Sequence, residues 1–482
     1  MMRTSTFRLS GEFVAESCGG RLVIGEGVVA EAGVAIDSRT IQPREAFVAI
    51  RGPRFDGHRF LSDATARGAV GLVVEEPAVE AALAAARAST ERAFVVAVDD
   101  TTRALQALAT AWVAVLQPIV VGVTGSVGKT TTKDMTAAVL AARFDCHATG
   151  GNRNNNFGLS LTCLKLVPSH EVLVAEMGMN APGEIRTLAT IAPPRIGVVT
   201  TVAPVHLEGL GTIEAVADAK AELVESLGPE GCAVLNADDP RVAAMRGRTG
   251  AGRVLTFGVA KDADVRIAAV EVGPDGRAAV TIEAGGARAI ARLQVVGAHQ
   301  ACNAAAAVAA GLALNVPLAD ACAAVGTVRA GRHRMEVVSA GTLRVLDDCY
   351  NASPKSMSAA LATLASIAAG GRCVAVIGDM LELGDATTDA HLDAGREAAA
   401  AGVECLIAVG RQADLVRRGA IEAGLPGTSI FVAPDAITAS SVALAVVLPR
   451  DTVLVKGSRG VGLEHVVEAM AARFAGVGAE GN

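Results

Sequence analysis

The sequence predicts a mixed α/β protein built from three units, and three observations support that fold class. The chain has 482 residues, of which 51% are hydrophobic and 19% charged, so it can bury several cores. Short apolar runs typical of buried parallel strands alternate with helical segments. A glycine-rich loop joins one of these runs to a helix, as in phosphate-binding sheets. We expect a small N-terminal α/β unit at 1–100, a central P-loop ATPase-like unit with a parallel sheet at 101–330, and a Rossmann-like unit at 331–482.

The first unit combines short strands with helices. Strand-like runs occur at 34–36, 47–50, 71–74 and 94–98. Helical patterns cover 60–67 and 79–88, and a connecting helix over 101–116 should end before Pro118, because proline cannot continue a helix.

The second unit begins with the apolar run 119–123. Further runs follow at 172–175, 196–199 and 233–235, which suits a parallel sheet covered on both faces. Residues 264–296 alternate more regularly and predict an antiparallel patch. An alanine-rich helix over 299–314 closes the unit.

The third unit follows a segment, 326–334, that has the composition of a hinge. Its strand-like runs lie at 343–346, 373–377, 405–409, 429–432 and 452–455. Helical segments separate them, so we expect a Rossmann-type sheet.

Composition argues against several classes of partner. The formal net charge is -7 and aromatic residues make up only 3%, so we expect no nucleic-acid partner. The most apolar long stretch, 304–318, is too short to span a bilayer, and we expect no signal peptide because residues 1–10 lack an apolar core. The nine cysteines are odd in number and scattered, which favours reduced thiols in the cytoplasm over a disulfide framework or a zinc site.

The strongest single motif is the loop Gly122-Val-Thr-Gly-Ser-Val-Gly-Lys-Thr-Thr131. Backbone N–H groups of such a loop bind phosphates at the helix N-terminus; Lys129 would reach the β- and γ-phosphates, and Thr130 would ligate Mg²⁺. The first glycine of the strict P-loop pattern is replaced by Val123, so a chance glycine-rich turn is the alternative. A regulatory GTPase is disfavoured because its guanine-reading Asn-Lys-x-Asp is absent.

Polar residues follow other predicted strands of the second unit. Glu176 directly follows the run 172–175 and could hold the magnesium of a nucleotide. His206 follows the next strand and could ligate a second metal ion, although a lone histidine is more often structural. Lys220 lies on a predicted helix, and by residue type alone we expect it at the surface. The loop 152–156 holds four asparagines whose amides could read a polar substrate.

Three clusters in the third unit favour a cleft that closes against the P-loop. They are Asp347-Asp348-Cys349-Tyr350-Asn351, Arg332-His333-Arg334 and Lys456-Gly457-Ser458-Arg459. The first and last follow predicted strands, where open α/β sheets bind ligands. Any one of them alone would be read as a solvated surface.

Taken together, the motifs resemble the Mur ligase family over nearly the whole chain. The resemblance includes the segments Asp37-Ser38-Arg39, 124–131, 151–156, 176–184, 206–209, 219–222, 236–240, 297–303, 347–354, 378–384 and 456–459. The last three are most similar to the family member that adds D-alanyl-D-alanine.

The resemblance implies a role for each matching position. Substrate contacts would come from Ser38 and Arg39, which match the uridine-nucleotide motif, and from Asn155 and Asn156. ATP would be bound by Gly125, Ser126, Val127, Gly128, Lys129, Thr130, Thr131, Asn303, Arg334 and Asp348. Magnesium would be held by Thr130, Glu176 and His206, and by Lys220, which matches a lysine that relatives carbamylate. Lys129, His206 and Lys220 would be the catalytic group.

The implied reaction is ATP-dependent ligation of D-alanyl-D-alanine to a UDP-N-acetylmuramoyl-tripeptide through an acyl phosphate. We expect ATP and Mg²⁺ as cofactors, those two substrates as partners, and a cytoplasmic monomer without a membrane span. Ser353 departs from the second asparagine usual in the third-unit motif, which affects only details of that loop. The alternatives are the diaminopimelate- or lysine-adding relative, whose Asp-Asn-Pro-Arg is absent from the third unit, a P-loop regulator, and a folylpolyglutamate synthetase-like ligase.

Overall fold

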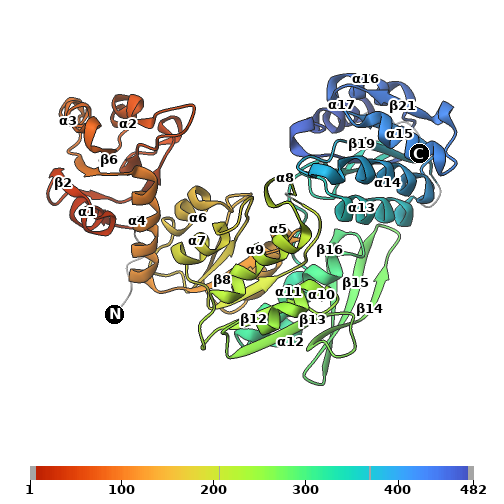
Figure 1. Ribbon diagram of the computed structural model, residues 1–482, viewed down its shortest axis with the longest axis horizontal. Coiled ribbons are helices and arrows are strands. Elements are labelled where there is room, and N and C mark those ends of the chain that lie inside the picture. Colours follow the sequence, from red (N-terminus) through yellow and green to blue (C-terminus); the bar gives the residue numbers. More distant parts are fainter. Residues whose placement is uncertain (1–6, 206, 369–370, 476–482) are drawn as a thin grey trace.

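The computed structural model describes residues 7–205, 207–368 and 371–475, and it contains three large sheets that follow one another along the chain. Figure 1 shows them in a row, each with helices packed against it. The predicted mixed α/β class is confirmed. Among the described residues, no helix is both long and apolar enough to cross a bilayer. All nine cysteines are free thiols.

The first sheet has five strands in the order β2-β7-β6-β5-β4. They are β2 (Arg21–Ile24), β4 (Gly33–Ala35), β5 (Glu45–Val48), β6 (Gly71–Glu75) and β7 (Phe94–Val98). β2 runs antiparallel to β7, and the other pairs are parallel. The helices are α1 (Gly11–Cys18), α2 (Leu61–Ala66) and α3 (Val79–Ala88), and β1 (Leu9–Ser10) pairs with β3 (Val29–Ala30). The short strands β1 to β3 and helix α1 were not predicted, because they carry no long apolar run.

Helix α4 (Thr101–Leu116) joins the first sheet to the second. Asp100 caps its N-terminus, where the side chain accepts a hydrogen bond from the Arg103 N–H, and Gln117 caps its C-terminus with a left-handed backbone just before Pro118. The indole of Trp112 donates to the Leu166 carbonyl at 3.0 Å. One continuous core therefore extends from the first sheet through α4 into the second.

The second sheet has nine strands in the order β16-β15-β14-β13-β12-β11-β8-β10-β9. They are β8 (Ile119–Thr124), β9 (Cys146–Ala148), β10 (Val172–Glu176), β11 (Ile196–Val199), β12 (Cys232–Asn236), β13 (Arg253–Gly258), β14 (Val265–Val272), β15 (Arg277–Ala284) and β16 (Ala287–Val296). Pairing is parallel from β9 to β14 and antiparallel beyond. The predicted antiparallel patch is confirmed, and its strand β14 also continues the parallel sheet through β13.

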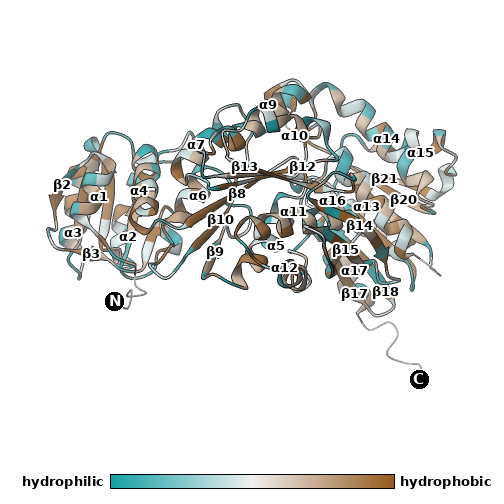
Figure 2. Ribbon diagram, turned by 90° about the horizontal axis from the view of Figure 1, so that it is seen from below, coloured by the Kyte–Doolittle hydropathy of each residue, from teal (hydrophilic) through white to brown (hydrophobic). Residues whose placement is uncertain are grey.

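Helices cover both faces of this sheet. They are α5 (Lys129–Ala141), α6 (Asn156–Cys163), α7 (Glu184–Ile191), α8 (Leu207–Leu210), α9 (Ile213–Glu225), α10 (Pro240–Ala244), α11 (Gln300–Ala313) and α12 (Leu318–Val325). Strands such as β8 and β10 are largely brown in Figure 2, as expected for strands buried on both faces. Helix α11 packs against α5 with a face composed mainly of alanine. These small side chains let the two helices approach closely.

The third sheet has six strands in the order β17-β18-β22-β19-β20-β21. They are β17 (Glu336–Ala340), β18 (Leu343–Asp348), β19 (Cys373–Gly378), β20 (Cys405–Val409), β21 (Ile430–Ala433) and β22 (Thr452–Lys456), with helices α13 (Pro354–Ile367), α14 (Thr387–Ala400), α15 (Ala413–Glu422), α16 (Ala436–Val446) and α17 (Glu464–Phe474). Every pair is parallel except β17 with β18. The predicted Rossmann-type sheet is confirmed, with β17 as an additional antiparallel edge.

The carboxyl ends of β18 and β22 lie side by side, because the two strands pair in parallel. Those ends carry Asp348 and Lys456. The third sheet is placed against the second by a close contact, in which a Cβ at Gly276 would come within 2.6 Å of Ile367 on α13. The polar ends of the third sheet thereby face the P-loop across a cavity.

Candidate active site

The glycine-rich loop connects β8 to α5, and hydrogen bonds join it to the segment that follows β11. Ser126 donates its backbone N–H to the Thr201 carbonyl at 2.7 Å, and Thr200 donates its hydroxyl to the Val127 carbonyl at 2.7 Å. Gly125 has a φ of 147°, and a Cβ there would lie 1.9 Å from the Thr200 hydroxyl oxygen. The loop therefore requires glycine at this position.

Gly128 stands at the start of α5 with a φ of 86°. A Cβ at this position would lie 2.3 Å from Oδ1 of Asn303 on α11, so glycine lets that amide approach the loop. The free N–H groups at the start of α5 make this helix end a site for phosphate.

Lys129 lies at the first turn of α5, where its Nζ donates to the Gly125 carbonyl at 2.7 Å. Burial lowers the pKa of Lys129, the nearby Glu176 carboxylate opposes that shift, and Arg334 adds to it. An ammonium group held by weak carbonyl partners in a buried position can exchange them for phosphate oxygens.

Glu176 ends β10 beneath the same loop and is 1% exposed. Its Oε2 accepts from the Thr130 hydroxyl at 2.8 Å, and its Oε1 accepts from the Asn154 amide at 2.8 Å. Hydroxyl and carboxylate oxygens are the ligands that Mg²⁺ prefers, so Thr130 and Glu176 fit a magnesium ion at the end of the P-loop.

The asparagine-rich loop lies beside Glu176. Asn155 caps the N-terminus of α6, where its side chain accepts from the Gly158 N–H at 2.8 Å, while the Asn156 side chain accepts from the Phe157 N–H at 3.0 Å. Asn154 was not among the predicted site residues, although its amide is the one that contacts Glu176. The run of four asparagines was the signal that could have identified it.

Lys220 lies on α9 and is only 2% exposed, so the expectation from residue type that it is a surface lysine is wrong. Burial lowers its pKa well below the ordinary value, and the positive charge of Lys129 lowers it further. A helical pattern alone does not reveal whether Lys220, the one lysine of 213–225, faces the core or the solvent. His206, the predicted metal ligand, lies outside the residues that the structure describes.

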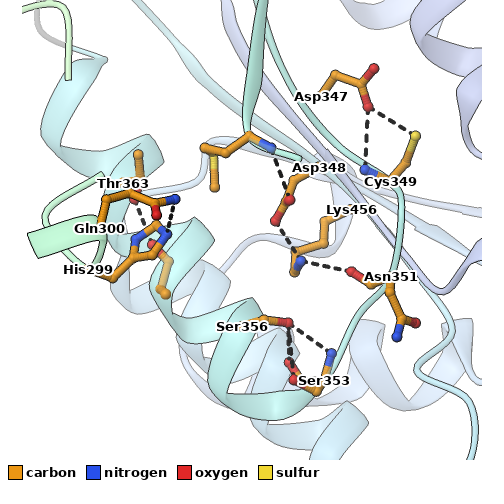
Figure 3. Close-up of polar contacts among 12 residues, drawn as sticks. His299, Gln300, Asp347, Asp348, Cys349, Asn351, Ser353, Ser356, Thr363 and Lys456 are labelled. Carbon is orange, nitrogen blue, oxygen red and sulfur yellow. Dashed lines mark hydrogen bonds and ion pairs between the residues drawn. The ribbon is translucent and has the colours of Figure 1, made fainter. Parts of the chain in front are cut away.

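The third sheet contributes a second set of charged groups. Lys456 donates to Asp348 Oδ2 at 2.5 Å and to the Asn351 carbonyl at 3.0 Å, as Figure 3 shows. The other Asp348 oxygen accepts from the Met335 N–H at 3.0 Å. Because Lys456 is 1% exposed, this pair is a fixed part of the sheet edge.

Arg334 lies at the end of the segment that joins the second and third units, and it stacks on the only tyrosine. Its guanidinium carbon is 3.8 Å from the centroid of the Tyr350 ring. A cation–π contact of this kind orients the guanidinium without neutralising it. The positive group thus remains available to an anion.

A cavity of about 460 Å³ lies between the second and third units and brings most of the predicted residues together. Its lining includes Ser126, Val127, Gly128, Lys129, Thr130, Thr131, Asn155, Asn156, Glu176, Asn303, Arg334 and Asp348, together with Asn154, His299, Gln300, Tyr350 and Lys456. Gly125 is part of the same loop, and Lys220 is near enough for the positive charge of Lys129 to lower its pKa.

Ser38 and Arg39 are not part of this cavity. They follow β4 in the first unit, where Ser38 is buried and Arg39 is exposed and paired with Asp37 at 2.7 Å. This pairing holds the pKa of Asp37 at about 2. Arg51 and Glu75 form an ion pair of 2.9 Å at the ends of the adjoining parallel strands β5 and β6. The first sheet therefore presents its own polar edge.

Family models match all three units. The Mur ligase family catalytic domain matches residues 32–112, the Mur ligase middle domain matches 123–311, and the Mur ligase glutamate ligase domain matches 333–459.

The similarity to two relatives extends over nearly the full length of this chain and of each relative. The UDP-N-acetylmuramoyl-tripeptide–D-alanyl-D-alanine ligase of Mycobacterium tuberculosis is 37% identical over 470 residues, which cover 91% of this chain and 92% of that protein. The ligase of the same name from Bacillus subtilis is 33% identical over 444 residues, covering 90% and 92%.

Solved structures agree with these sequence matches. A crystal structure of MurF from Acinetobacter baumannii superposes with a TM-score of 0.85 at 27% identity, covering 98% of this chain and all of that chain (100%). MurF ligase from Thermotoga maritima in complex with ADP gives 0.77 at 26% identity, covering 92% and 97%. With matches of this extent in both sequence and fold, the chain belongs to the Mur ligase family.

Proposed function

We propose that this protein joins D-alanyl-D-alanine to UDP-N-acetylmuramoyl-tripeptide at the expense of ATP, in the synthesis of peptidoglycan precursors. The observation that carries the proposal is the cavity in which the P-loop and Glu176 face Asp348 and Lys456. The full-length similarity to ligases of this activity supports the choice of substrates. We further propose that the enzyme acts in the cytoplasm as a monomer.

Each of the three units would have its own role in the reaction. Residues 1–100 would bind the uridine nucleotide through Ser38 and Arg39, and residues 101–330 would bind ATP. Residues 331–482 would close over the reacting groups. The polar edge around Asp37 and Arg39 supports the first assignment, since a diphosphate is a good partner for an exposed arginine.

The first chemical step brings two anions together, because the tripeptide carboxylate attacks the γ-phosphate of ATP. The N–H groups of the loop at the start of α5, other than the Ser126 N–H that is bonded to Thr201, and the ammonium of Lys129 would neutralise that repulsion. Asn303, Arg334 and Asp348 would hold the nucleotide from α11, the linker and the third sheet. Asn155 and Asn156 would orient the tripeptide end.

Thr130 and Glu176 would hold Mg²⁺, with His206 as a further ligand. The bound ion supplies positive charge at the phosphate oxygens. Lys220 is proposed to carry a carbamate, which converts a buried cation into an anion that can support a second Mg²⁺. Its lowered pKa supports this, because a neutral amine is the form that reacts with carbon dioxide.

The second step is attack by the amine of D-alanyl-D-alanine on the acyl phosphate, which releases inorganic phosphate. An acyl phosphate hydrolyses when water reaches it, so the third unit must exclude water during this step.

The test is phosphate release from ATP with UDP-N-acetylmuramoyl-tripeptide, measured with and without D-alanyl-D-alanine. Release that requires both substrates, with a pentapeptide product by mass, supports the proposal. Release with L-lysine or diaminopimelate and a dipeptide substrate would assign the protein to the other relative. Release indifferent to acceptor would refute the ligase assignment.

A further inference from the structure

Three side chains with different metal-binding atoms meet at the start of the third unit. His333, in the turn before β17, places its Nδ1 2.7 Å from Oδ2 of Asp347, near the end of β18. The other oxygen of Asp347 accepts from the thiol of Cys349 at 3.0 Å, a contact drawn in Figure 3. One nitrogen, one carboxylate oxygen and one sulfur therefore lie within 4.8 Å of one another.

The carboxylate of Asp347 is weakly neutralised for a buried group. Asp347 is 2% exposed, and in the described part of the chain its oxygens are bonded to His333, to the Cys349 thiol and, at 3.4 Å, to the Cys349 N–H. A thiol is a weak donor, and a histidine carries charge only when it is protonated. Buried carboxylates are ordinarily paired with a full positive charge or bound to a metal ion. A divalent ion would supply the positive charge that these partners lack.

Negative charge also surrounds Cys349. Burial raises the pKa of its thiol, the hydrogen bond to Asp347 raises it further, and the charges of Asp347, Glu464 and Asp348 act in the same direction. The thiol is therefore protonated at neutral pH and is not a reactive thiolate. A cation beside the sulfur would be attracted by the same carboxylates that keep the proton there.

The cluster lies apart from the cavity that contains the P-loop. Asp347 and Asp348 are consecutive residues of β18, so their side chains point to opposite faces of the third sheet. A second cavity, of about 400 Å³, is lined by His333, Cys349 and Glu464, among others. This cavity gives an ion a path to the nitrogen and the sulfur.

The remaining wall of the second cavity is rich in positive charge, because it includes Lys133, Arg332, Arg334 and Arg459. Weakly held cations are repelled there, so a bound ion must form strong bonds to sulfur and nitrogen. Thiolate and imidazole ligands favour Zn²⁺, whereas Mg²⁺ prefers oxygen ligands. The cluster is therefore selective for a different class of metal from the pair Thr130 and Glu176.

We propose that His333, Asp347 and Cys349 form a binding site for a zinc-type divalent ion. A tetrahedral zinc ion with bonds of about 2.0–2.3 Å holds its ligand atoms about 3.3–3.7 Å apart, so shifts of about 1 Å bring the three atoms to that spacing. On binding, Cys349 loses its proton to solvent, and the His333 proton that faces Asp347 moves from Nδ1 to Nε2, which leaves Nδ1 free to bind the ion. Water from the second cavity completes the coordination. Cysteine spacing could not indicate this site, because a single cysteine contributes to it.

An ion at this site would fix the segment that joins the second and third units. His333 has a φ of 61°, in the left-handed region that residues other than glycine rarely adopt. Its carbonyl accepts from the Tyr350 N–H at 3.0 Å, and the next residue, Arg334, stacks on the Tyr350 ring. A metal bond to His333 would stabilise this conformation and with it the position of Arg334.

The test is a titration of the metal-free, full-length protein with Co²⁺, which binds as Zn²⁺ does and is visible by absorption. A large excess of Mg²⁺ keeps Co²⁺ from the oxygen ligands Thr130 and Glu176. One equivalent of Co²⁺ should produce a thiolate-to-cobalt charge-transfer band in the near ultraviolet, and added Zn²⁺ should abolish it. Absence of this band from the parent chain would overturn the proposal.

Three variants locate the band. Cys349→Ser should lose it, and a band that survives there would overturn the proposal. His333→Asn, in which asparagine tolerates the left-handed backbone, should bind Co²⁺ at least about tenfold more weakly. Parental affinity of His333→Asn would also overturn the proposal, and this partly exposed position keeps the test decisive if Cys349→Ser does not fold. Cys146→Ser is the matched control, because Cys146 is another thiol next to a histidine, and it should bind Co²⁺ as the parent chain does.

Proteolysis tests the effect on the linker. At a free Zn²⁺ concentration about ten times its Kd, cleavage by trypsin after Arg332 should slow by about tenfold, because the ion must leave before the segment can open. The rate for His333→Asn should be unaffected by Zn²⁺. Equal slowing of both proteins, or of neither, would overturn the proposed site between the linker and β18.

Discussion

Replacing Lys129 should abolish most of the ligase activity while leaving the uridine-nucleotide substrate bound. The ammonium is buried at the start of α5 and is held only by loop carbonyls, at 2.7 Å from that of Gly125. Two unit charges about 4 Å apart interact by about 4 kcal/mol at an effective dielectric constant of about 20. If Lys129 faces the transferring phosphate, Lys129→Ala should slow turnover by about three orders of magnitude.

The assay is phosphate release with both substrates at saturation, accompanied by calorimetric binding of UDP-N-acetylmuramoyl-tripeptide. Lys129→Met retains much of the aliphatic stem and should be as slow as Lys129→Ala, because the charge and not the packing is lost. Lys261→Met, at an exposed position between β13 and β14, is the control and should behave as the parent chain. Unchanged turnover of either Lys129 variant would refute the assigned role, and loss of substrate binding would show a more general defect.

Four further outcomes are expected. Lys220→Ala should be inactive and partly restored by short carboxylic acids, which supply the missing anion; parental activity without added acid would contradict a carbamate. Glu176→Gln should raise the Mg²⁺ concentration needed for half-maximal rate, and an unaltered Mg²⁺ titration would remove it from the metal site. Trp112→Ala should lower the free energy of unfolding by about 3–5 kcal/mol, because it leaves a cavity in a core shared by two sheets; denaturant titrations followed by circular dichroism measure this loss. A loss below about 1 kcal/mol would show that Trp112 packing contributes little to the stability of the junction. Burial, with a smaller contribution from His170, lowers the pKa of His147 to about 4. Between about pH 6.5 and pH 4 the unfolded chain therefore binds more protons than the folded chain does. The free energy of unfolding should decrease as the pH falls through that range. His147→Gln should flatten that slope, and an identical slope would show that another group causes it.

The sequence predicted the sheets well because buried parallel strands are continuous apolar runs. The P-loop and Glu176 were found for a related reason, since polar residues directly after such runs must meet at one edge of the sheet. Strands β9 and β13 were not predicted, because polar residues interrupt their apolar sequences. Short length and mixed composition remove the periodic signal.

Contacts between distant segments could not be predicted in the same way. Thr132 and Asn303 are 171 residues apart, and their hydrogen bond depends on how closely α5 and α11 pack. The burial of Lys220 likewise depends on which face of α9 the sheet covers. Such relationships come from tertiary packing, which local patterns do not encode.

The scarcity of aromatic residues gives the protein two natural optical probes in informative places. Its single tryptophan, Trp112, lies where α4 joins the first two sheets, and its single tyrosine, Tyr350, lies under Arg334 in the wall of the cavity. Tryptophan emission should therefore report on the junction of the first two units alone. Tyrosine emission should respond to nucleotide entering beside Arg334, so the two probes report on different boundaries between units.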